Sequence, residues 1–514
     1  MQMGVKFVCA LAAVGLAWGM SMPAYGDPLT VKTAQGKAQG KTINDGKVKA
    51  FLGLPYAAPP VGEMRWKAPG PPAKWKGTRD ATKFGARCAQ GRIFEDMVFQ
   101  DAGPSEDCLF LNVYAPADAT DKSKLPVMFW IHGGGYAGGA SSEPRHNGDF
   151  LPLKGVVLVT INYRLGVFGF LATSELAKEA GGTAGNYALM DMVAALQWVK
   201  GNIGKFGGDS SNVTIFGESA GSFAVSTLMA APAAQGLFEK AIGESGGAFS
   251  DVLPVDSLAD REAKDGDWVA GLGVNSLAEL RALPTGKLLA AAKAKKGGFS
   301  TVVDGKLLTE PVPATYAAGK QADVPTLTGW NKGENGGSPN PTVTAAAFQA
   351  QAKQRYADRA EEFLKLYPAA TDEQAHLSQN ESSWDQQRVS TYLWARERAK
   401  TAKSNAYTYF WDHALPGPDA GLYGAFHSSE VPYALNTLYM SERPFTAADH
   451  SIADQVSGYW ANFATTGDPN GKGLANWPAV GGKPETMEIG DKPGAIAVAG
   501  SAEKLAFWEK FLTK

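Results

Sequence analysis

The chain lacks an excess of charge of either sign, and this balance excludes two kinds of partner. Its 49 Lys and Arg face 51 Asp and Glu, which gives a formal net charge of -2. Such a chain has no global field that would attract nucleic acid or an anionic membrane. Histidine is also scarce, with 6 in 514 residues and none clustered with a cysteine or with another histidine. The scarcity of histidine therefore predicts no metal site. The balanced charge predicts a small, roughly neutral substrate.

After its first 26 residues the chain has no apolar run long enough to span a membrane. Its beginning carries Lys6, an apolar run over 7–20 and then Ala24-Tyr25-Gly26, which fits the cleavage site of a signal peptide. A transmembrane anchor is the rival interpretation, but a span needs roughly 20 apolar residues. We predict a signal peptide over 1–26, cleaved between Gly26 and Asp27, and a secreted or periplasmic mature protein.

Cysteine is rarer still, with 3 in the chain. Cys9 lies inside the predicted signal peptide, which leaves Cys88 and Cys108. In an exported chain such a pair favours a disulfide, with two buried free thiols as the alternative. Closing this loop would stabilise the fold by on the order of 3 kcal/mol.

Short apolar runs alternate with amphipathic stretches along much of the chain. Runs that end in polar or turn-forming residues predict buried strands, and apolar residues at three- and four-residue spacing over 186–203 predict a helix. Strands that alternate with helices predict an α/β fold with a mainly parallel sheet covered on both faces. The predicted strands are 126–131, 156–162, 213–216, 241–243, 326–329 and 406–411, and further predicted helices are 220–229, 451–465 and 502–512.

Between about 251 and 400 the strand signal thins and helical patterns dominate, for example over 276–295 and 345–367. The strand pattern resumes at 406. We interpret this segment as a helical elaboration over the sheet and not as a separate domain.

The strand predicted over 213–216 runs into Gly217-Glu218-Ser219-Ala220-Gly221 and then into a helix. In this context a G-x-S-x-G motif places its serine on a tight turn, with the hydroxyl exposed at the carboxyl edge of the sheet. The five residues alone are only moderately specific, because a structural turn would look similar. Ser219 is the predicted nucleophile.

A second motif, His132-Gly133-Gly134-Gly135, directly follows the strand predicted over 126–131. Acyl transfer needs two or three backbone N–H groups aimed at the developing oxyanion. Gly134 and Gly135 would donate together with Ala220. Either motif alone could be a flexible turn, but the two in this order indicate a serine hydrolase.

A serine hydroxyl is a weak nucleophile near neutral pH and needs a base. His132 belongs to the glycine motif, where a structural role is the simpler interpretation. His413 ends a predicted strand, whereas His427 lies in a loop between that strand and the next apolar stretch, so the pattern favours His427. The other histidines lie in polar stretches that we expect to be exposed: His146, His376 and His450.

An acid must orient the imidazole, and the chain order in this fold is serine, acid, histidine. Glu334 follows the strand predicted over 326–329 and would emerge at the same edge of the sheet as Ser219. Among 51 acidic residues this position is suggestive.

Taken together, these motifs resemble those of the type-B carboxylesterase family, which also contains cholinesterases and some fungal lipases. The resemblance runs over nearly the whole mature chain. The segments that carry it are 51–65 (FLGLPYAAPPVGEMR), 106–113, 132–135, 162–166, 206–209, 217–221 and the stretches around Glu334 and His427.

The resemblance implies a single α/β-hydrolase domain over 27–514, a large mostly parallel sheet flanked by helices whose insertions form a gorge. It implies Ser219, Glu334 and His427 as a catalytic triad. The other implied sites are an oxyanion hole of Gly134, Gly135 and Ala220, a Cys88–Cys108 disulfide, an Arg65–Glu106 ion pair, and Ser245 as a support of the histidine region.

Three residues depart from the family pattern. Ser428 stands where the family usually has Gly after the histidine, Asn335 where it usually has Gly after the acid, and Met192 where it usually has Gln. None of these departures removes a reacting group.

The resemblance implies two-step hydrolysis of a small-molecule carboxylic ester without a metal or organic cofactor. Small to medium esters, including aromatic or bulky ones, are the expected substrates. Lipase, amidase or lactonase activity on the same triad is the alternative, and a non-catalytic binding protein is disfavoured because the triad is intact. Four aromatic residues could line the gorge, but such residues are more often core, so none is assigned to binding: Tyr136, Trp384, Trp394 and Trp411. No oligomeric state follows from the sequence.

Overall fold

The computed structural model of the chain describes residues 29–95, 97–247, 255–334 and 343–513. The predicted signal peptide over 1–26, its cleavage site between Gly26 and Asp27, and Asn335 lie outside the described residues. Among the helices of the described ranges, none is both long and apolar enough to cross a membrane.

An 11-stranded sheet runs through the molecule. In spatial order its strands are β18 (Gly494–Ala497), β17 (Glu485–Gly490), β16 (Ala406–Asp412), β15 (Thr326–Asn331), β12 (Lys240–Glu244), β11 (Gly208–Glu218), β9 (Leu125–Ile131), β10 (Val157–Ile161), β8 (Phe110–Pro116), β4 (Val48–Pro55) and β3 (Lys41–Ile43). Neighbouring strands from β10 to β17 are parallel, and antiparallel pairs form both edges. The predicted α/β fold with a mainly parallel sheet is confirmed.

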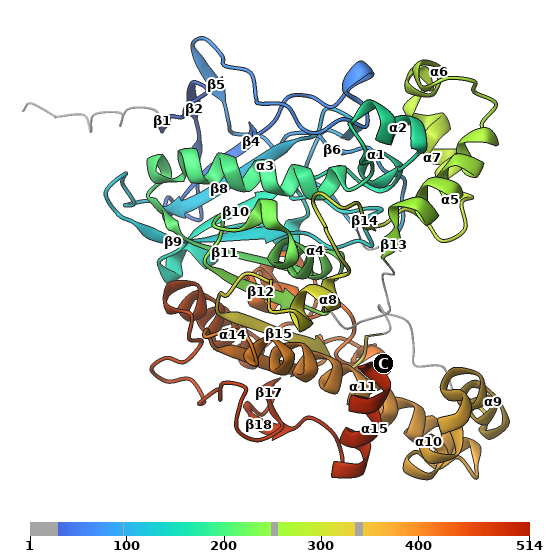
Figure 1. The fold of residues 1–514 in the computed structure, drawn as a ribbon. Coiled ribbons are helices and arrows are strands. Elements are labelled where there is room, and N and C mark those ends of the chain that lie inside the picture. The colour runs from blue at the N-terminus through green and yellow to red at the C-terminus, as the bar shows by residue number, and fades with distance from the viewer. Residues whose placement is uncertain (1–28, 96, 248–254, 335–342, 514) are drawn as a thin grey trace, which may run out of the picture.

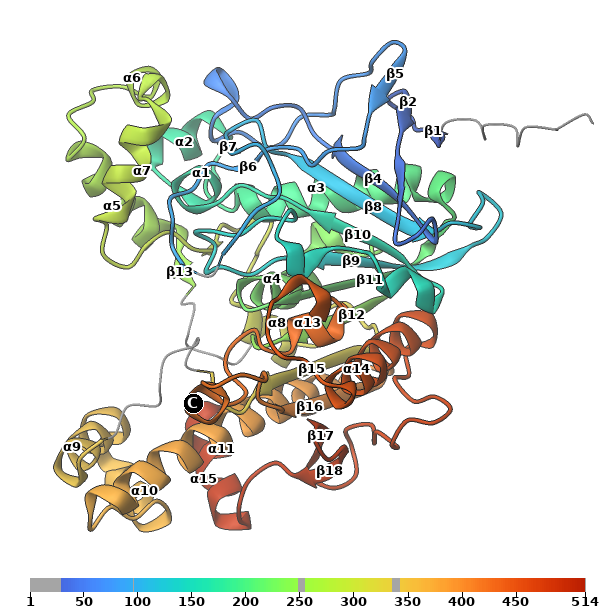
Figure 2. The ribbon, with the colours of Figure 1, turned by 180° about the vertical axis from the view of Figure 1, so that it is seen from behind.

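Helices cover both faces of this sheet. Along β9, Val127, Phe129 and Ile131 pack in one core cluster with α3 (Tyr187–Asn202) and α4 (Ala220–Ala230). Met128 and Trp130 face the opposite way and pack in a second cluster with α14 (Ala447–Thr466). The helix α3 lies in front of the sheet in Figure 1, and α13 (Val431–Ala434) lies in front in Figure 2. A strand buried on both faces is apolar throughout, which is why these strands are recognisable as continuous runs.

Most of the chain between β12 and β16 is helical. Its helices are α5 (Leu258–Ala270), α6 (Leu277–Ala282), α7 (Thr285–Lys293), α8 (Val312–Ala317), α9 (Ala345–Tyr356), α10 (Ala360–Leu366) and α11 (Asp372–Ala399). The groups α5–α7 and α9–α10 lie on the same side of the molecule, at opposite ends (Figure 1).

Two of the predicted helices are broken. The helix predicted over 276–295 is two helices, α6 and α7, because Leu283 precedes Pro284 and takes an extended conformation with ψ of 135°. The helix predicted over 345–367 is α9 and α10, which are separated at Ala357, where φ is +48°. In both places local backbone sterics override the periodicity of the apolar residues.

The remaining elements are small or lie at the ends of the chain. They are β1 (Thr30–Lys32), β2 (Lys37–Gln39) and β5 (Thr78–Asp80) in one sheet, the pair β6 (Arg87–Cys88) and β7 (Pro104–Ser105), the pair β13 (Asp256–Ser257) and β14 (Val302–Val303), and the helices α1 (Gly166–Phe170), α2 (Ser174–Glu179), α12 (Ala420–Tyr423) and α15 (Ala502–Leu512).

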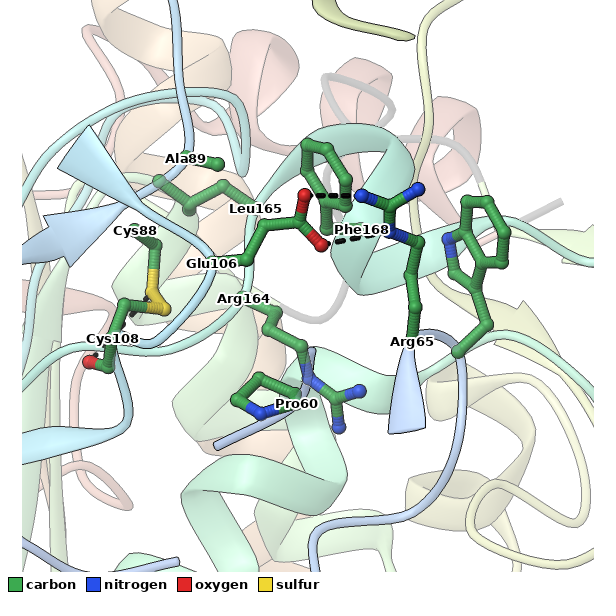
Figure 3. A pocket seen from close by; sticks show the side chains of 10 residues that line it. Pro60, Arg65, Cys88, Ala89, Glu106, Cys108, Arg164, Leu165 and Phe168 are labelled. Carbon is green, nitrogen blue, oxygen red and sulfur yellow. Dashed lines mark hydrogen bonds and ion pairs between the residues drawn. A yellow bond between two sulfur atoms is a disulfide. The ribbon is translucent and has the colours of Figure 1, made fainter. Parts of the chain in front are cut away.

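Cys88 and Cys108 form the disulfide that the resemblance implied. Near it, the guanidinium of Arg65 donates to both carboxylate oxygens of Glu106, at 2.7 Å from Nε and 2.5 Å from Nη2 (Figure 3). The implied ion pair is thus confirmed. Arg65 also donates to two backbone carbonyl oxygens, those of Arg281 at 2.7 Å and Leu283 at 2.8 Å. A buried, bidentate ion pair of this kind fixes both side chains. Through its bonds to the two carbonyl oxygens, Arg65 links the disulfide region to the end of α6.

Candidate active site

Ser219 lies on the tight turn between β11 and α4. Its φ is +56° and its ψ is -123°, a region that residues other than glycine rarely adopt. A Cβ on Gly217 would lie 2.4 Å from the carbonyl oxygen of Ile131, and a Cβ on Gly221 would lie 2.0 Å from the same atom. Both positions therefore require glycine, and the turn holds Ser219 at the carboxyl end of β11.

The glycine loop that follows β9 lies beside this turn. A Cβ on Gly133 would lie 2.5 Å from Oε2 of Glu218 and 3.0 Å from the serine Cβ. The φ angles of Gly134 and Gly135 are +101° and +61°, which favour glycine. Throughout the described ranges, the backbone N–H groups of Gly134, Gly135 and Ala220 have no hydrogen-bond acceptor in the protein. They remain able to donate to a ligand.

Glu334 and His427 are in contact although they are 93 residues apart in the chain. Nδ1 of His427 donates to Oε2 of Glu334. A backbone hydrogen bond also joins their two loops, since the N–H of Gly333 donates to the carbonyl oxygen of Ala425 at 2.8 Å. This contact fixes the tautomer of the ring, since a proton held at Nδ1 leaves Nε2 as the nitrogen that can act as a base.

Ser245 and Asn331 hold the other carboxylate oxygen of Glu334. Oε1 accepts a hydrogen bond from Oγ of Ser245 and one from the backbone N–H of Asn331, both at 2.7 Å. Ser245 follows β12 directly, and Asn331 is the last residue of β15. Ser245 therefore contacts the carboxylate that also contacts His427, and its hydrogen bond restricts the orientation of that carboxylate.

Nε2 of His427 faces Glu218. Oε1 of Glu218 lies 3.1 Å from this nitrogen, and among the described residues no hydrogen bond joins Nε2 to Oγ of Ser219. Such catalytic hydrogen bonds are often long in a structure without substrate. Glu218, at the variable position of the G-x-S-x-G motif, is not among the site residues predicted from the sequence. A charged side chain in a motif otherwise made of small residues is the signal that could have found it.

Several buried carboxyl groups gather around His427. Burial raises the pKa of Glu218, although the adjacent His427 opposes this shift. Burial raises the pKa of Glu430 to about 8 and that of Glu244 well above its usual range. For His427, burial lowers the pKa, but the carboxylates of Glu218 and Glu334 outweigh it and raise the pKa above the ordinary value of 6.5. Each of these three carboxyl groups is therefore harder to ionise than an exposed one, whereas the ring of His427 is easier to protonate.

His413, the alternative base, lies in a different network. Its Nδ1 lies 2.7 Å from Oδ1 of Asp491, and its Nε2 lies 3.0 Å from both the hydroxyl of Tyr433 and Oδ1 of Asp449. None of these groups belongs to the loops that carry Ser219 or Glu334, which supports the choice of His427.

In the part of the chain that the structure describes, no three His, Cys, Asp or Glu residues are grouped so that they could hold a metal ion.

The aromatic residues considered for the gorge divide into two kinds. Tyr136, Trp394 and Trp411 are buried, as expected for core residues, whereas Trp384 is half-buried. The departure at Met192 is also a core position, because its side chain is fully buried in α3. It lies outside the network around His427.

His132 and His146 are buried side by side, with ring centroids 6.4 Å apart. The prediction that His146 is exposed is wrong: it is 2% exposed because the short helix Pro144–His146 turns its ring inward, where Nδ1 donates to the carbonyl oxygen of Ala140 at 2.9 Å. Burial lowers the pKa of His132 to about 4 and that of His146 to about 3. Both rings are neutral at neutral pH, which fits a structural role.

This pair of neutral rings makes the fold sensitive to acid. An unfolded chain binds protons at histidine below a pKa of about 6.5, whereas the folded chain excludes them from His132 until about pH 4 and from His146 until about pH 3. The free energy of unfolding therefore falls as pH falls below 6.5, by about 3 kcal/mol for each ring at pH 4.5. Urea titrations at several pH values measure this slope. In His146→Asn, whose amide can keep the bond to Ala140, the slope is expected to be smaller, and an unchanged slope would contradict the assignment.

Known proteins resemble this chain along most of its length. The model of the family described as "Carboxylesterase family" matches residues 27–508. The chain is 34% identical over 512 residues to fumonisin B1 esterase of Sphingopyxis macrogoltabida, with 94% of this chain and 92% of that protein covered. It is 35% identical over 470 residues to para-nitrobenzyl esterase of Bacillus subtilis (strain 168), with 87% and 92% covered. It is 33% identical over 504 residues to cocaine esterase of Homo sapiens, with 90% and 87% covered. A solved structure of PNB esterase matches with a TM-score of 0.78 at 31% identity, over 94% of this chain and 99% of the other.

Proposed function

The chain belongs to the carboxylesterase family, and from that premise we propose that Ser219, His427 and Glu334 form its catalytic triad. The protein is a serine hydrolase that acts on carboxylic esters. The observation that carries the proposed triad is the contact of Nδ1 of His427 with Oε2 of Glu334, beside the strained turn that presents Ser219.

The proposed reaction passes through an acyl-enzyme. Nε2 of His427 takes the proton of Ser219 Oγ as this oxygen attacks the ester carbonyl, and Glu334 stabilises the resulting imidazolium through Nδ1. The N–H groups of Gly134, Gly135 and Ala220, which have no acceptor among the described residues, supply the oxyanion hole. Nε2 then returns the proton to the leaving alcohol, and water hydrolyses the acyl-enzyme by the same route. The step begins only when Nε2 carries no proton.

For the substrate, we propose small to medium carboxylic esters, including aromatic or bulky ones. The names of three relatives refer to fumonisin B1, para-nitrobenzyl and cocaine esters, which are different compounds. These names support a carboxylic ester as the substrate without singling out one ester. Lipase, amidase or lactonase activity on the same triad is the alternative.

A panel that presents one acyl group in different linkages tests this choice. We expect kcat/KM for an aryl ester to exceed that for the matched anilide by about 10² or more, because an amide leaving group depends on proton donation and a phenolate does not. The matched lactone and triacylglycerol emulsion complete the panel, with rates followed by product release. A higher kcat/KM for the amide, lactone or emulsion would replace the esterase proposal with the corresponding alternative.

We also propose that residues 27–514 form one exported catalytic domain, elaborated over about 251–400 by helices that wall a gorge. The supporting observations are the pattern of Lys6, the apolar run over 7–20 and the small residues before Asp27. The Cys88–Cys108 disulfide supports export as well, since disulfides persist in oxidising compartments. One sheet that takes strands from β3 to β18 supports a single domain.

A further inference from the structure

Ser428 follows the proposed base in a strained conformation. Its φ is +70°, in the left-handed region, and it stands where the family usually has glycine. For a residue with a Cβ this conformation is sterically unfavourable. Backbone strain of this kind is a reason to ask what the side chain contributes.

The hydroxyl of Ser428 is bonded to the carboxylate beside the base. Its Oγ donates to Oε1 of Glu218 at 2.6 Å, and this same oxygen lies 3.1 Å from Nε2 of His427. The other oxygen of Glu218, Oε2, lies against the glycine loop that follows β9, where it would be 2.5 Å from a Cβ on Gly133. The side chain of Glu218 is only 5% exposed. The carboxylate of Glu218 thus lies between the glycine loop and the loop that carries His427. The hydroxyl of Ser428 supplies the hydrogen bond on the side of His427.

We propose that Ser428 is a positioning residue that holds the ionised Glu218 carboxylate against Nε2 of His427 and so sets the pH at which His427 becomes a base. The inference rests on the proposed triad. A hydroxyl that donates to a carboxylate favours its charged form, and a carboxylate beside an imidazole favours the protonated ring. Because the general base must first lose its Nε2 proton, Ser428 raises the pH at which hydrolysis begins.

Other charged groups act on the same pair but do not depend on Ser428. The carboxylates of Glu334 and Glu430 raise the pKa of His427, and the guanidinium of Arg145 lowers that of Glu218. The titratable groups that surround the pair, on all the elements packed against it, are Glu244, Glu334, Glu430, Arg145, Tyr163 and Tyr409. A substitution at 428 leaves all of these side chains in place, so a changed pH profile reports on Glu218.

The experiment compares pH profiles of kcat/KM for an aryl ester in the full-length protein. Ser428→Gly removes the hydroxyl and relieves the strain, whereas Ser428→Ala removes the hydroxyl and keeps the Cβ. In both variants we expect the acid limb to move to lower pH by about 0.5–1 unit, with kcat on the plateau within about threefold of the original. Glu218→Gln, which removes the charge itself, is expected to move the limb in the same direction and further.

Ser429→Ala is the matched control. The hydroxyl of Ser429 lies in the same loop but accepts a hydrogen bond from Nε1 of Trp411 at 3.0 Å. Its loss is expected to lower Tm without moving the acid limb. The inference is overturned if the limb stays in place in Ser428→Gly and Ser428→Ala, if it moves in only one of them, or if it moves equally in Ser429→Ala. Failure of the proposed triad would look different, because the Ser219→Ala variant would then still hydrolyse the aryl ester.

Discussion

Replacing Ser219 by alanine is expected to lower kcat/KM for an aryl ester by about 10⁴–10⁶. In the proposed mechanism the substitution removes the oxygen that forms the acyl-enzyme, so the proposed oxyanion hole has no covalent intermediate to stabilise. The variant should also lose covalent labelling by an organophosphonate, which intact-mass measurement detects as an added phosphonyl group. Stability should change little, because the side chain of Ser219 makes no hydrogen bond within the described part of the chain.

Ser226→Ala is a closely matched control for this result. Ser226 lies in α4, the helix that follows Ser219, and is buried, and its hydroxyl has no hydrogen-bond partner among the described residues. Its replacement is expected to preserve both turnover and labelling. If Ser219→Ala kept normal turnover, or kept the phosphonate adduct, the nucleophile would have to be another residue and the proposed mechanism would fail.

The central strands could be predicted from the sequence because burial on both faces makes them continuous apolar runs. The antiparallel strands near the edges were missed for physical reasons. β8 contains Asn112, a buried polar residue whose amide nitrogen lies 3.0 Å from both Ser141 Oγ and Thr160 Oγ1. β18 buries none of its residues completely. A satisfied polar residue inside a strand and a half-exposed edge both look like loops when neighbours in space are unknown.

The same limit applies to the candidate site. Ser219 and the glycine loop could be predicted because each motif is local and follows a recognisable strand. The bond between Ser428 and Glu218 joins residues 210 positions apart, and the contact of Nε2 with Glu218 joins the same two loops. Such contacts are fixed by how β11 and the histidine loop meet in space, so no spacing in the sequence reveals them. The inward orientation of the His146 ring is likewise fixed by contacts in space that the sequence does not reveal.

Replacing His427 by alanine is expected to reduce kcat/KM by about 10⁴–10⁶, close to the loss in Ser219→Ala, because the serine hydroxyl keeps its proton and remains a weak nucleophile. Labelling by the organophosphonate should slow by a similar factor, because it uses the same attack. Removal of the ring leaves space between Glu334 and Glu218, so added imidazole should restore part of the rate in a concentration-dependent manner. Both effects can be followed with the aryl ester and by intact mass.

His413→Gln provides the comparison that separates the two candidate bases. His413 contacts Asp491, Tyr433 and Asp449, so its loss is expected to lower the free energy of unfolding by about 1 kcal/mol while kcat/KM stays within a few-fold. Imidazole should have no effect on this variant, since Nε2 of His427 is intact. The reverse pattern, with activity lost in His413→Gln and kept in His427→Ala, would show that the contact of Nδ1 with Glu334 is structural and that the base lies in the other network.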